Sequence, residues 1–154
     1  MKQRWLPVGL LAAAIFVINV VARYISWKFK VDNPDTQSRL GVIGLIVVGL
    51  VLVGASTWWS IRFPFGRVVA DVGVAVIAGT LLALVIGPFA GGSRPFAEGL
   101  ESFVGETLLF FAVGAVGGLL GFVLATAVGK DWRSRSLRQY EQRYARKPHK
   151  PVRG

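Results

Sequence analysis

The chain has 154 residues, contains no cysteine, and has a single histidine, His149, in a basic tail. The absence of cysteine excludes a disulfide framework, a thiol nucleophile and a thiolate metal site. No Ser/His pair, pair of neighbouring aspartates or metal-ligand spacing occurs elsewhere. We therefore expect neither enzymatic activity nor a bound metal or cofactor.

Nucleotide-binding motifs are also missing, although glycine is abundant. The stretch 114–121 lacks the G-x-G-x-x-G spacing, and no predicted strand precedes it. Gly129-Lys130 fails as a P-loop because Asp131 replaces the required Ser or Thr, and no glycine stands five residues before Gly129. Nothing resembles a nucleic-acid-binding fold, so we expect no nucleic-acid partner.

Long apolar runs are the main feature that is present. The chain is 53% hydrophobic with a mean hydropathy of +0.55, and its apolar runs reach the roughly 18 residues at which a spanning helix is expected. The sequence predicts an all-α integral membrane protein, in which residues 1–129 form a bundle of four transmembrane helices. The predicted helices cover about 6–22, 40–61, 68–87 and 103–128.

The first segment, 6–22, is barely long enough to span a membrane. A cleavable signal peptide is the alternative, because Val20 and Ala22 fit a small-residue cleavage pattern. We favour a retained helix, since the apolar stretch is long for a signal sequence, and cleavage would leave three helices. Residues 23–39 are polar and are predicted to form an interfacial loop with a turn signal at 33–35.

The second and third segments are predicted to form a helical hairpin. Pro64 and Gly66 interrupt the helical pattern, and Arg62 and Arg67 flank this short connection. A connection of this length makes its two helices antiparallel neighbours. Pro88 is expected to end the third segment.

The distribution of Lys and Arg predicts that both termini are cytoplasmic. Thirteen basic residues would then lie inside and five outside, as the positive-inside rule favours. The inner set is Lys2, Arg4, Arg62, Arg67 and the nine basic residues of 130–154, and the outer set is Arg23, Lys28, Lys30, Arg39 and Arg94. The first outer loop is basic for its position. High Ala, Gly, Val and Arg usage resembles that of GC-rich bacteria, which favours a bacterial plasma membrane as the location.

Two rows of small residues are predicted to mediate helix packing, either within this chain or with a partner. In lipid, small side chains allow the close approach on which helix association depends. The rows contain Ala75, Gly79, Ala83 and Gly87 on the third segment, and Gly114, Gly117, Gly118, Gly121 and Ala125 on the fourth.

Three intramembrane polar residues, Asn19, Asp71 and Glu106, are candidates for function because the bilayer makes them costly. Arg67 and Asp71 have i, i+4 spacing, which predicts an ion pair near the interface. Glu106 falls in the predicted first turn of its helix, where the helix dipole favours a carboxylate. Asp71 and Glu106 are expected at opposite ends of the bundle. Asn19 lies near the outer end and could hydrogen-bond to Glu106.

The tail, 130–154, is predicted to contain a basic amphipathic helix on the inner leaflet. Leu137, Tyr140 and Tyr144 form its apolar stripe, and prolines at 148 and 151 end any helix. Several cations near an anionic surface can together hold such a helix there. A solvated tail that only sets topology is the alternative. The predicted lipid-facing cations are Arg133, Arg135, Arg138, Arg143 and Arg146.

These features favour an accessory or assembly subunit of a larger membrane complex, acting through helix contacts with other subunits or with a second copy. The alternative is a small oligomeric transporter or channel that uses Asp71 or Glu106. Small multidrug-type transporters share the length and helix number, but the deep carboxylate of their first helix has no counterpart here, where that segment offers only Asn19.

Overall fold

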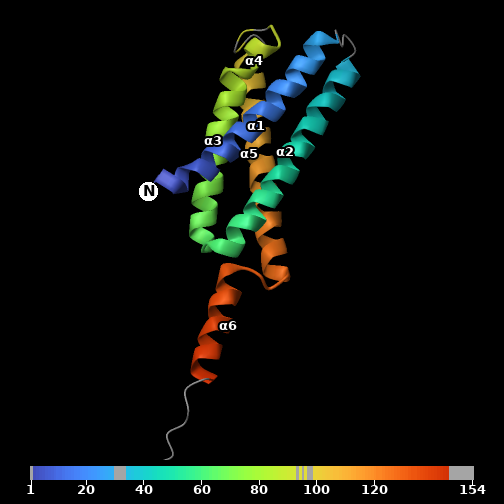
Figure 1. Ribbon diagram of the computed structural model, residues 1–154. Coiled ribbons are helices and arrows are strands. Elements are labelled where there is room, and N and C mark those ends of the chain that lie inside the picture. The colour runs from blue at the N-terminus through green and yellow to red at the C-terminus, as the bar shows by residue number, and fades with distance from the viewer. Residues whose placement is uncertain (1, 30–33, 93, 95, 97–98, 146–154) are drawn as a thin grey trace, which may run out of the picture.

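Helices make up most of the chain in the computed structural model, which describes residues 2–29, 34–92, 94, 96 and 99–145 (Figure 1). Four helices in this described part are long and apolar enough to cross a membrane, and it contains no strand. They are α1 Lys2–Lys28, α2 Pro34–Arg62, α3 Phe65–Val85 and α5 Leu100–Ala127. The predicted all-α bundle is confirmed, and the chain is a multi-pass membrane protein.

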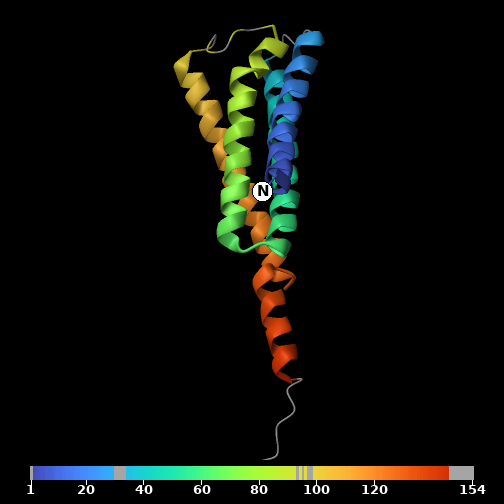
Figure 2. The same cartoon turned by 60° about the vertical axis from the view of Figure 1, so that its left-hand side comes forward.

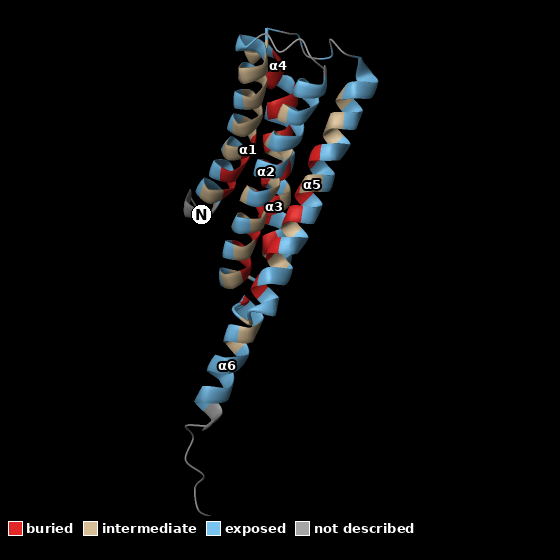
Figure 3. Ribbon diagram, turned by 90° about the vertical axis from the view of Figure 1, so that its right-hand side faces the viewer, coloured by how far each residue is buried: buried red, intermediate tan, exposed pale blue. Residues whose placement is uncertain are grey.

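Each long helix reaches across a bilayer. The shortest, α3, has 21 residues and is therefore roughly 31 Å long, against a hydrocarbon core of about 30 Å. Large apolar side chains cover the outward faces of all four helices, and the buried residues line the inward faces (Figure 3). This pattern, apolar outside as well as inside, is that of a bundle surrounded by lipid.

The prediction of a loop over 23–39 is wrong at both ends, because α1 continues to Lys28 and α2 already begins at Pro34. The polar residues that suggested a loop have partners within the helical bundle. The Ser26 hydroxyl donates to the Ala22 carbonyl oxygen one turn back, and Arg23 pairs with another helix. α2 begins at Pro34, a residue whose fixed φ suits the first helical position. Pro34 and Asp35 of the predicted turn lie in the first turn of α2 instead, and Asn33 lies outside the described residues.

The helices pack as two close pairs, α2 with α5 and α1 with α3. The connection from α1 to α2 defines one end of the bundle, called the α1/α2 end below, and the turn from α2 to α3 defines the opposite α2/α3 end (Figure 1). α5 leans away from the other helices toward the α1/α2 end, where it begins (Figure 2). The bundle is therefore closed at the α2/α3 end and splayed at the α1/α2 end.

The predicted hairpin between α2 and α3 is present. Pro64 precedes α3 in an extended conformation. The Phe63 amide donates to the Trp59 carbonyl oxygen of α2, and the Arg67 amide donates to the Pro64 carbonyl oxygen. Both flanking arginines stack on aromatic rings: the Arg62 guanidinium carbon lies 4.1 Å from the centre of the Trp58 ring, and that of Arg67 lies 3.8 Å from the centre of Phe63. This layer of cations and aromatic rings is typical of a membrane interface.

α3 ends at Val85, and a short helix, α4 Gly87–Ala90, follows it. Pro88 occupies the first turn of α4, so proline ends α3 as predicted. Gly87 is buried against α1, where an added Cβ would lie 3.0 Å from the Asn19 side-chain oxygen. α4 therefore closes one side of the α1/α2 end.

The contact between α2 and α5 is the tightest in the bundle. An added Cβ on Gly121 would lie 2.7 Å from the Ser56 Cβ and 3.0 Å from the Thr57 amide nitrogen, and closer still to the Val53 carbonyl oxygen. The Thr57 hydroxyl donates to the Gly121 carbonyl oxygen at 3.1 Å, a hydrogen bond between the two helices. One turn earlier, Gly117 lies against the backbone of α2 in the same way. Glycine is required here because backbone meets backbone.

Glycines also allow the close contacts of α3 with α1 and with α5. An added Cβ on Gly79 would lie 3.0 Å from the Ala12 carbonyl oxygen and 2.9 Å from the Ile15 Cβ of α1. On α5, a Cβ at Gly114 would lie 2.8 Å from a methyl group of Val76. These contacts join α1 and α5 to neighbouring positions on α3.

The small residues predicted for packing therefore lie at contacts inside this chain. The buried ones are Ala75, Gly79, Ala83, Gly87, Gly114, Gly117, Gly121 and Ala125, and Gly118 is half-buried. Because these rows are covered by neighbouring helices of the same chain, they are not available to a partner.

A tight cap ends α5 and starts the last helix, α6 Trp132–Ala145. Gly129 has φ +62°, and the Gly129 and Lys130 amides bond to the Thr126 and Ala125 carbonyl oxygens at 2.8 and 3.1 Å. This is the Schellman arrangement, in which glycine takes the left-handed conformation that other residues avoid. Asp131 then caps α6, since its Oδ2 accepts from the Arg133 and Ser134 amides at 3.2 and 3.3 Å.

α6 extends away from the bundle along its long axis and is exposed on nearly all sides (Figure 3). The helix itself was predicted, but its placement along the membrane surface is not what the structure shows. After the cap at 129–131, α6 continues in the direction of the bundle axis and does not turn perpendicular to that axis. Leu137 and Tyr140 of the predicted stripe are exposed. The Tyr144 side chain and Arg146 lie outside the described residues.

The cap gives α6 a defined pH dependence. The Ser134 hydroxyl, and then the Ser134 and Arg133 amides, hold the pKa of Asp131 below its ordinary value of 3.8, while burial opposes them. The stabilisation is therefore complete above pH 3.8 and is lost as the pH falls through the lowered pKa.

We expect Asp131→Ala to weaken α6 by about 1 kcal/mol at neutral pH, seen as loss of helical ¹³C chemical shifts over 132–145 in micelles. Asp131→Asn is the control, because asparagine keeps the acceptor but not the charge. It should retain helix at neutral pH and show no loss on acidification. An equal change in helix content of the wild type and the Asn variant on acidification would contradict this assignment.

Candidate functional site

The two intramembrane carboxylates lie at opposite ends of the bundle, as predicted. Asp71 is buried near the start of α3, at the α2/α3 end, and its Oδ2 lies 3.5 Å from the Arg67 Nε. The i, i+4 ion pair expected from the sequence is therefore present. It belongs to the interfacial layer of Arg67 and Phe63 and does not line the cavity described below.

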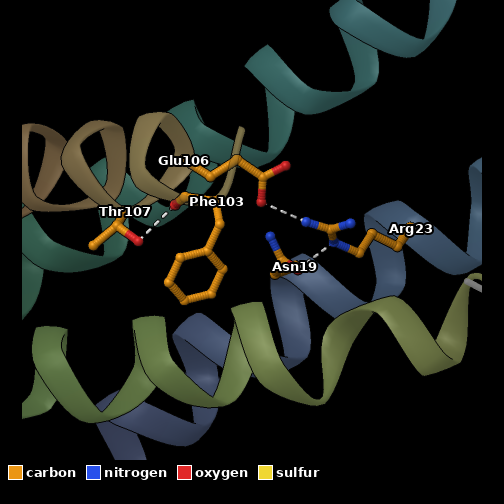
Figure 4. Close-up of polar contacts among 5 residues, drawn as sticks. All are labelled: Asn19, Arg23, Phe103, Glu106 and Thr107. Atoms are coloured by element: carbon orange, nitrogen blue, oxygen red, sulfur yellow. Dashed lines mark hydrogen bonds and ion pairs between the residues drawn. The ribbon is translucent and has the colours of Figure 1, made fainter. Parts of the chain in front are cut away.

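Glu106 has a partner that the sequence did not indicate. Its Oε2 lies 2.7 Å from an Nη of Arg23, which comes from α1, and the two residues are 83 positions apart. The Arg23 Nε donates to the Asn19 Oδ1 at 3.0 Å (Figure 4). Asn19 therefore bonds to Arg23, and the predicted direct bond from Asn19 to Glu106 is replaced by a chain in which the guanidinium joins the two.

The helices fix this chain of three residues. Asn19 and Arg23 are one turn apart on α1 and so lie on one face of that helix. α5 begins at Leu100, three residues earlier than predicted, which places Glu106 in its second turn and away from the helix end. The main partner of the Glu106 carboxylate is therefore the Arg23 guanidinium and not the helix dipole.

The side chains of the Arg23–Glu106 pair are partly exposed. The side chains are 27% and 40% exposed, and an ion pair of that exposure contributes about 1 kcal/mol or less to stability. Weak pairs of this kind exchange partners easily. Arg23 uses two of its five N–H groups in the bonds described, which leaves donors for a third group.

An open cavity of about 1190 Å³ lies beside this pair, where α5 splays from α1 and α2. Its walls come from these three helices and from Gly91 after α4. The lining residues of α1 are Ile18, Asn19, Ala22, Arg23, Tyr24, Ser26, Trp27 and Lys28. The others are Gln37, Ser38, Gly41, Val42, Gly44, Leu45, Val48, Gly105, Glu106, Leu109 and Phe110.

The cavity wall changes character along the bundle. Toward the α1/α2 end it carries Trp27, Lys28 and Gln37, and deeper in the bundle it carries Val48 and Phe110, both buried. The Lys28 ammonium lies 5.7 Å from the centre of the Tyr24 ring. The cavity is therefore polar and aromatic toward the α1/α2 end and apolar deeper in the bundle, and this combination is usual for a small-molecule site.

Sequence reasoning singled out Asn19 and Glu106 but missed Arg23, Trp27 and Lys28. Because the stretch 23–39 is polar, it was assigned to a loop. One signal was available: Asn19, Arg23 and Trp27 repeat every fourth residue, the spacing of one helix face. The pairing with Glu106 joins distant parts of the chain and has no local signal.

In the described part of the chain, no three His, Cys, Asp or Glu side chains gather in a group that could hold a metal ion. The charged groups that line the cavity are one guanidinium, one ammonium and one carboxylate. Comparisons of the chain with the known protein families, with curated proteins and with solved structures find no match.

Proposed function

We propose that this chain is a small, non-enzymatic membrane transporter whose substrate enters the cavity between α1, α2 and α5. The observation that carries the proposal is the Arg23–Glu106 pair in the wall of a cavity of about 1190 Å³. Ionisable residues inside spanning helices are costly and commonly mark a substrate or ion pathway. Here the costly residues border an open space that can admit a substrate.

The shape of the bundle supports this proposal. The cavity lies toward the α1/α2 end, while glycine contacts pack α5 onto α2 and α3 farther along the bundle. A transporter exposes its site to one side at a time, and helices that rock against each other provide this change. The splayed beginning of α5 (Figure 2) is the part that would move.

Glu106 and Asp71 have different roles in this proposal. Glu106 is half-exposed at the cavity and shares a guanidinium that can take another partner, so it is the group that responds to substrate. Asp71 is only 4% exposed and pairs with Arg67 at the opposite end, so it stabilises the α2/α3 end. The sequence allowed a transporter that uses Asp71 or Glu106, and we propose that Glu106 is the residue used.

The proposed location is the bacterial plasma membrane, with both termini in the cytoplasm. The support is the excess of Lys and Arg at the N-terminus, at the α2/α3 turn and in the tail. In that orientation the cavity opens to the outside. α6 projects into the cytoplasm, and its cations can bind anionic lipid at the inner leaflet when the helix bends toward it.

Flux through reconstituted liposomes tests the proposal. The wild-type protein is expected to raise proton or ion flux above that of empty liposomes, and Glu106→Gln is expected to abolish the increase. Asp71→Asn is the matched control, because it removes a carboxylate far from the cavity, and it should retain the flux. Wild-type flux in the Glu106→Gln protein would exclude Glu106 from the mechanism.

An accessory subunit remains the second candidate, and one observation favours it. α6 is a basic helix, exposed along most of its length, and it projects from the bundle as a docking element would (Figure 1). The small-residue rows no longer support this candidate because they are buried within the chain. Purification in a mild detergent followed by mass spectrometry tests it, and a monomer without co-eluting proteins would count against it.

A further inference from the structure

The charges at the cavity are unequal. Arg23 and Lys28 are cations, and Glu106 is the one carboxylate among the lining residues. Even with the Arg23–Glu106 pair intact, one positive charge remains. Asp35 and Arg39 are exposed on α2 outside the lining. An anionic group entering the cavity therefore meets a net attraction, and a cationic group meets a net repulsion.

The positive-inside rule gives no reason for cations at this end of the bundle. Basic residues on the outer side oppose the topology that the rest of the sequence sets. In the structure, Arg23 and Lys28 border a cavity instead of lying in a solvated loop. A role in binding an anion accounts for this placement, and arginine in particular presents a fork of donors that matches phosphate.

The deep part of the cavity favours a ligand that has an apolar part as well as an anionic group. Leu45, Val48, Leu109 and Phe110 form an apolar wall below the charged residues. Free phosphate would leave this wall without a partner, whereas a hydrocarbon chain attached to the phosphate would cover it. The cavity volume of about 1190 Å³ exceeds the 300 to 1,000 Å³ typical of small-molecule sites, which leaves room for part of a chain.

We propose that this cavity binds a phosphate-bearing lipid, whose head group bonds to Arg23 and Lys28 and takes the place of Glu106 on the guanidinium. The acyl chain lies along Leu45, Val48, Leu109 and Phe110. This inference rests on the proposed function, since it names a class of ligand for the same cavity, and the binding of this ligand is measured separately from proton or ion flux. Glu106 then acts as an internal competitor that occupies Arg23 when no lipid is bound.

This arrangement predicts opposite effects for the two members of the ion pair. Arg23→Gln removes a charged donor to the phosphate and should weaken binding about tenfold, the size of one charge-assisted hydrogen bond. Glu106→Gln removes the competitor and should strengthen binding. Lys28→Gln should weaken binding without disturbing the ion pair, so it covers the case in which the Arg23 variant does not fold.

Native mass spectrometry of the full chain in micelles measures these affinities directly. Phosphatidic acid and phosphatidylcholine with the same acyl chains serve as probes, and inorganic phosphate serves as a competitor. Arg39→Gln is the matched control, because Arg39 is an exposed cation at the same end that does not line the cavity. Its affinity for phosphatidic acid should equal that of the wild type.

The expected result is preferential binding of phosphatidic acid, weakened by Arg23→Gln and strengthened by Glu106→Gln, with little competition from free phosphate. Equal binding of both lipids would overturn the proposal, as would full displacement by inorganic phosphate. The reverse signs in the two variants would identify a site for cations. Flux that depends on Glu106 without binding of phosphatidic acid would refute this inference alone, and binding with the expected signs but no flux would refute only the transport proposal.

Discussion

Replacing Gly121 with alanine is expected to lower the free energy of unfolding by about 3 kcal/mol, the upper part of the range for overpacked sites. The added Cβ meets the Val53 carbonyl oxygen and lies 3.0 Å from the Thr57 amide nitrogen. Both are backbone atoms and cannot rotate away. α2 and α5 would have to separate, which also stretches the bond from the Thr57 hydroxyl to the Gly121 carbonyl oxygen.

Gly54→Ala is the matched control for this substitution. Gly54 lies in the middle of α2, is exposed, and has nothing within 4 Å of an added Cβ. Alanine there should be neutral or stabilising, since it favours a helix over glycine by up to about 1 kcal/mol. Gly114→Ala should fall between the two, because its obstacle is the Val76 side chain, which can adjust.

Unfolding in mixed micelles, followed by circular dichroism, measures all three variants. The order of stability should be Gly54→Ala, then Gly114→Ala, then Gly121→Ala. If the Gly54 and Gly121 variants unfolded alike, the close contact between α2 and α5 would not exist as described.

The spanning helices could be predicted because the signal is local. In a bilayer, backbone groups must be satisfied within each segment, so an apolar run of sufficient length becomes a helix whatever surrounds it. The packing rows followed from the same logic, since a repeat every fourth residue places Gly117 and Gly121 on one face. The repeat did not specify which helix covers that face, and the structure places α2 there.

The site could be predicted only in part, because its partners are distant in sequence. Glu106 was singled out because a carboxylate inside a membrane is energetically costly. Its partner, Arg23, lies on α1 and could not be identified from the sequence around Glu106. Arg23 was assigned to a loop because polar residues at a segment end usually face water. Here Arg23 pairs with Glu106 of α5, and α1 continues past it to Lys28.

The tail shows a similar limit. Its helical periodicity was readable, but its direction depends on the cap at Gly129 and Asp131, where the backbone takes φ +62°. Amphipathic patterning describes which face is apolar and does not describe how the helix leaves the preceding one. A membrane-parallel position for α6 would require a bend at this cap.

The central claim is that water and solutes reach the Arg23–Glu106 pair through the cavity, and cysteine labelling tests it most directly. The chain has no cysteine, so a single introduced cysteine is its only thiol. Thiols react as thiolates, which form in water and not in lipid or in a packed interface. Ala22 is half-buried and lines the cavity, whereas Val53 is half-buried at the contact of α2 with α5.

In proteoliposomes with the cavity facing outward, an impermeant reagent added outside should label Ala22→Cys to completion while Val53→Cys stays unlabelled. An anionic thiosulfonate should also react with Ala22→Cys faster than a cationic one, by roughly fivefold for the excess positive charge. Equal protection of both cysteines, or faster reaction with the cationic reagent, would contradict the account of an open, anion-attracting cavity.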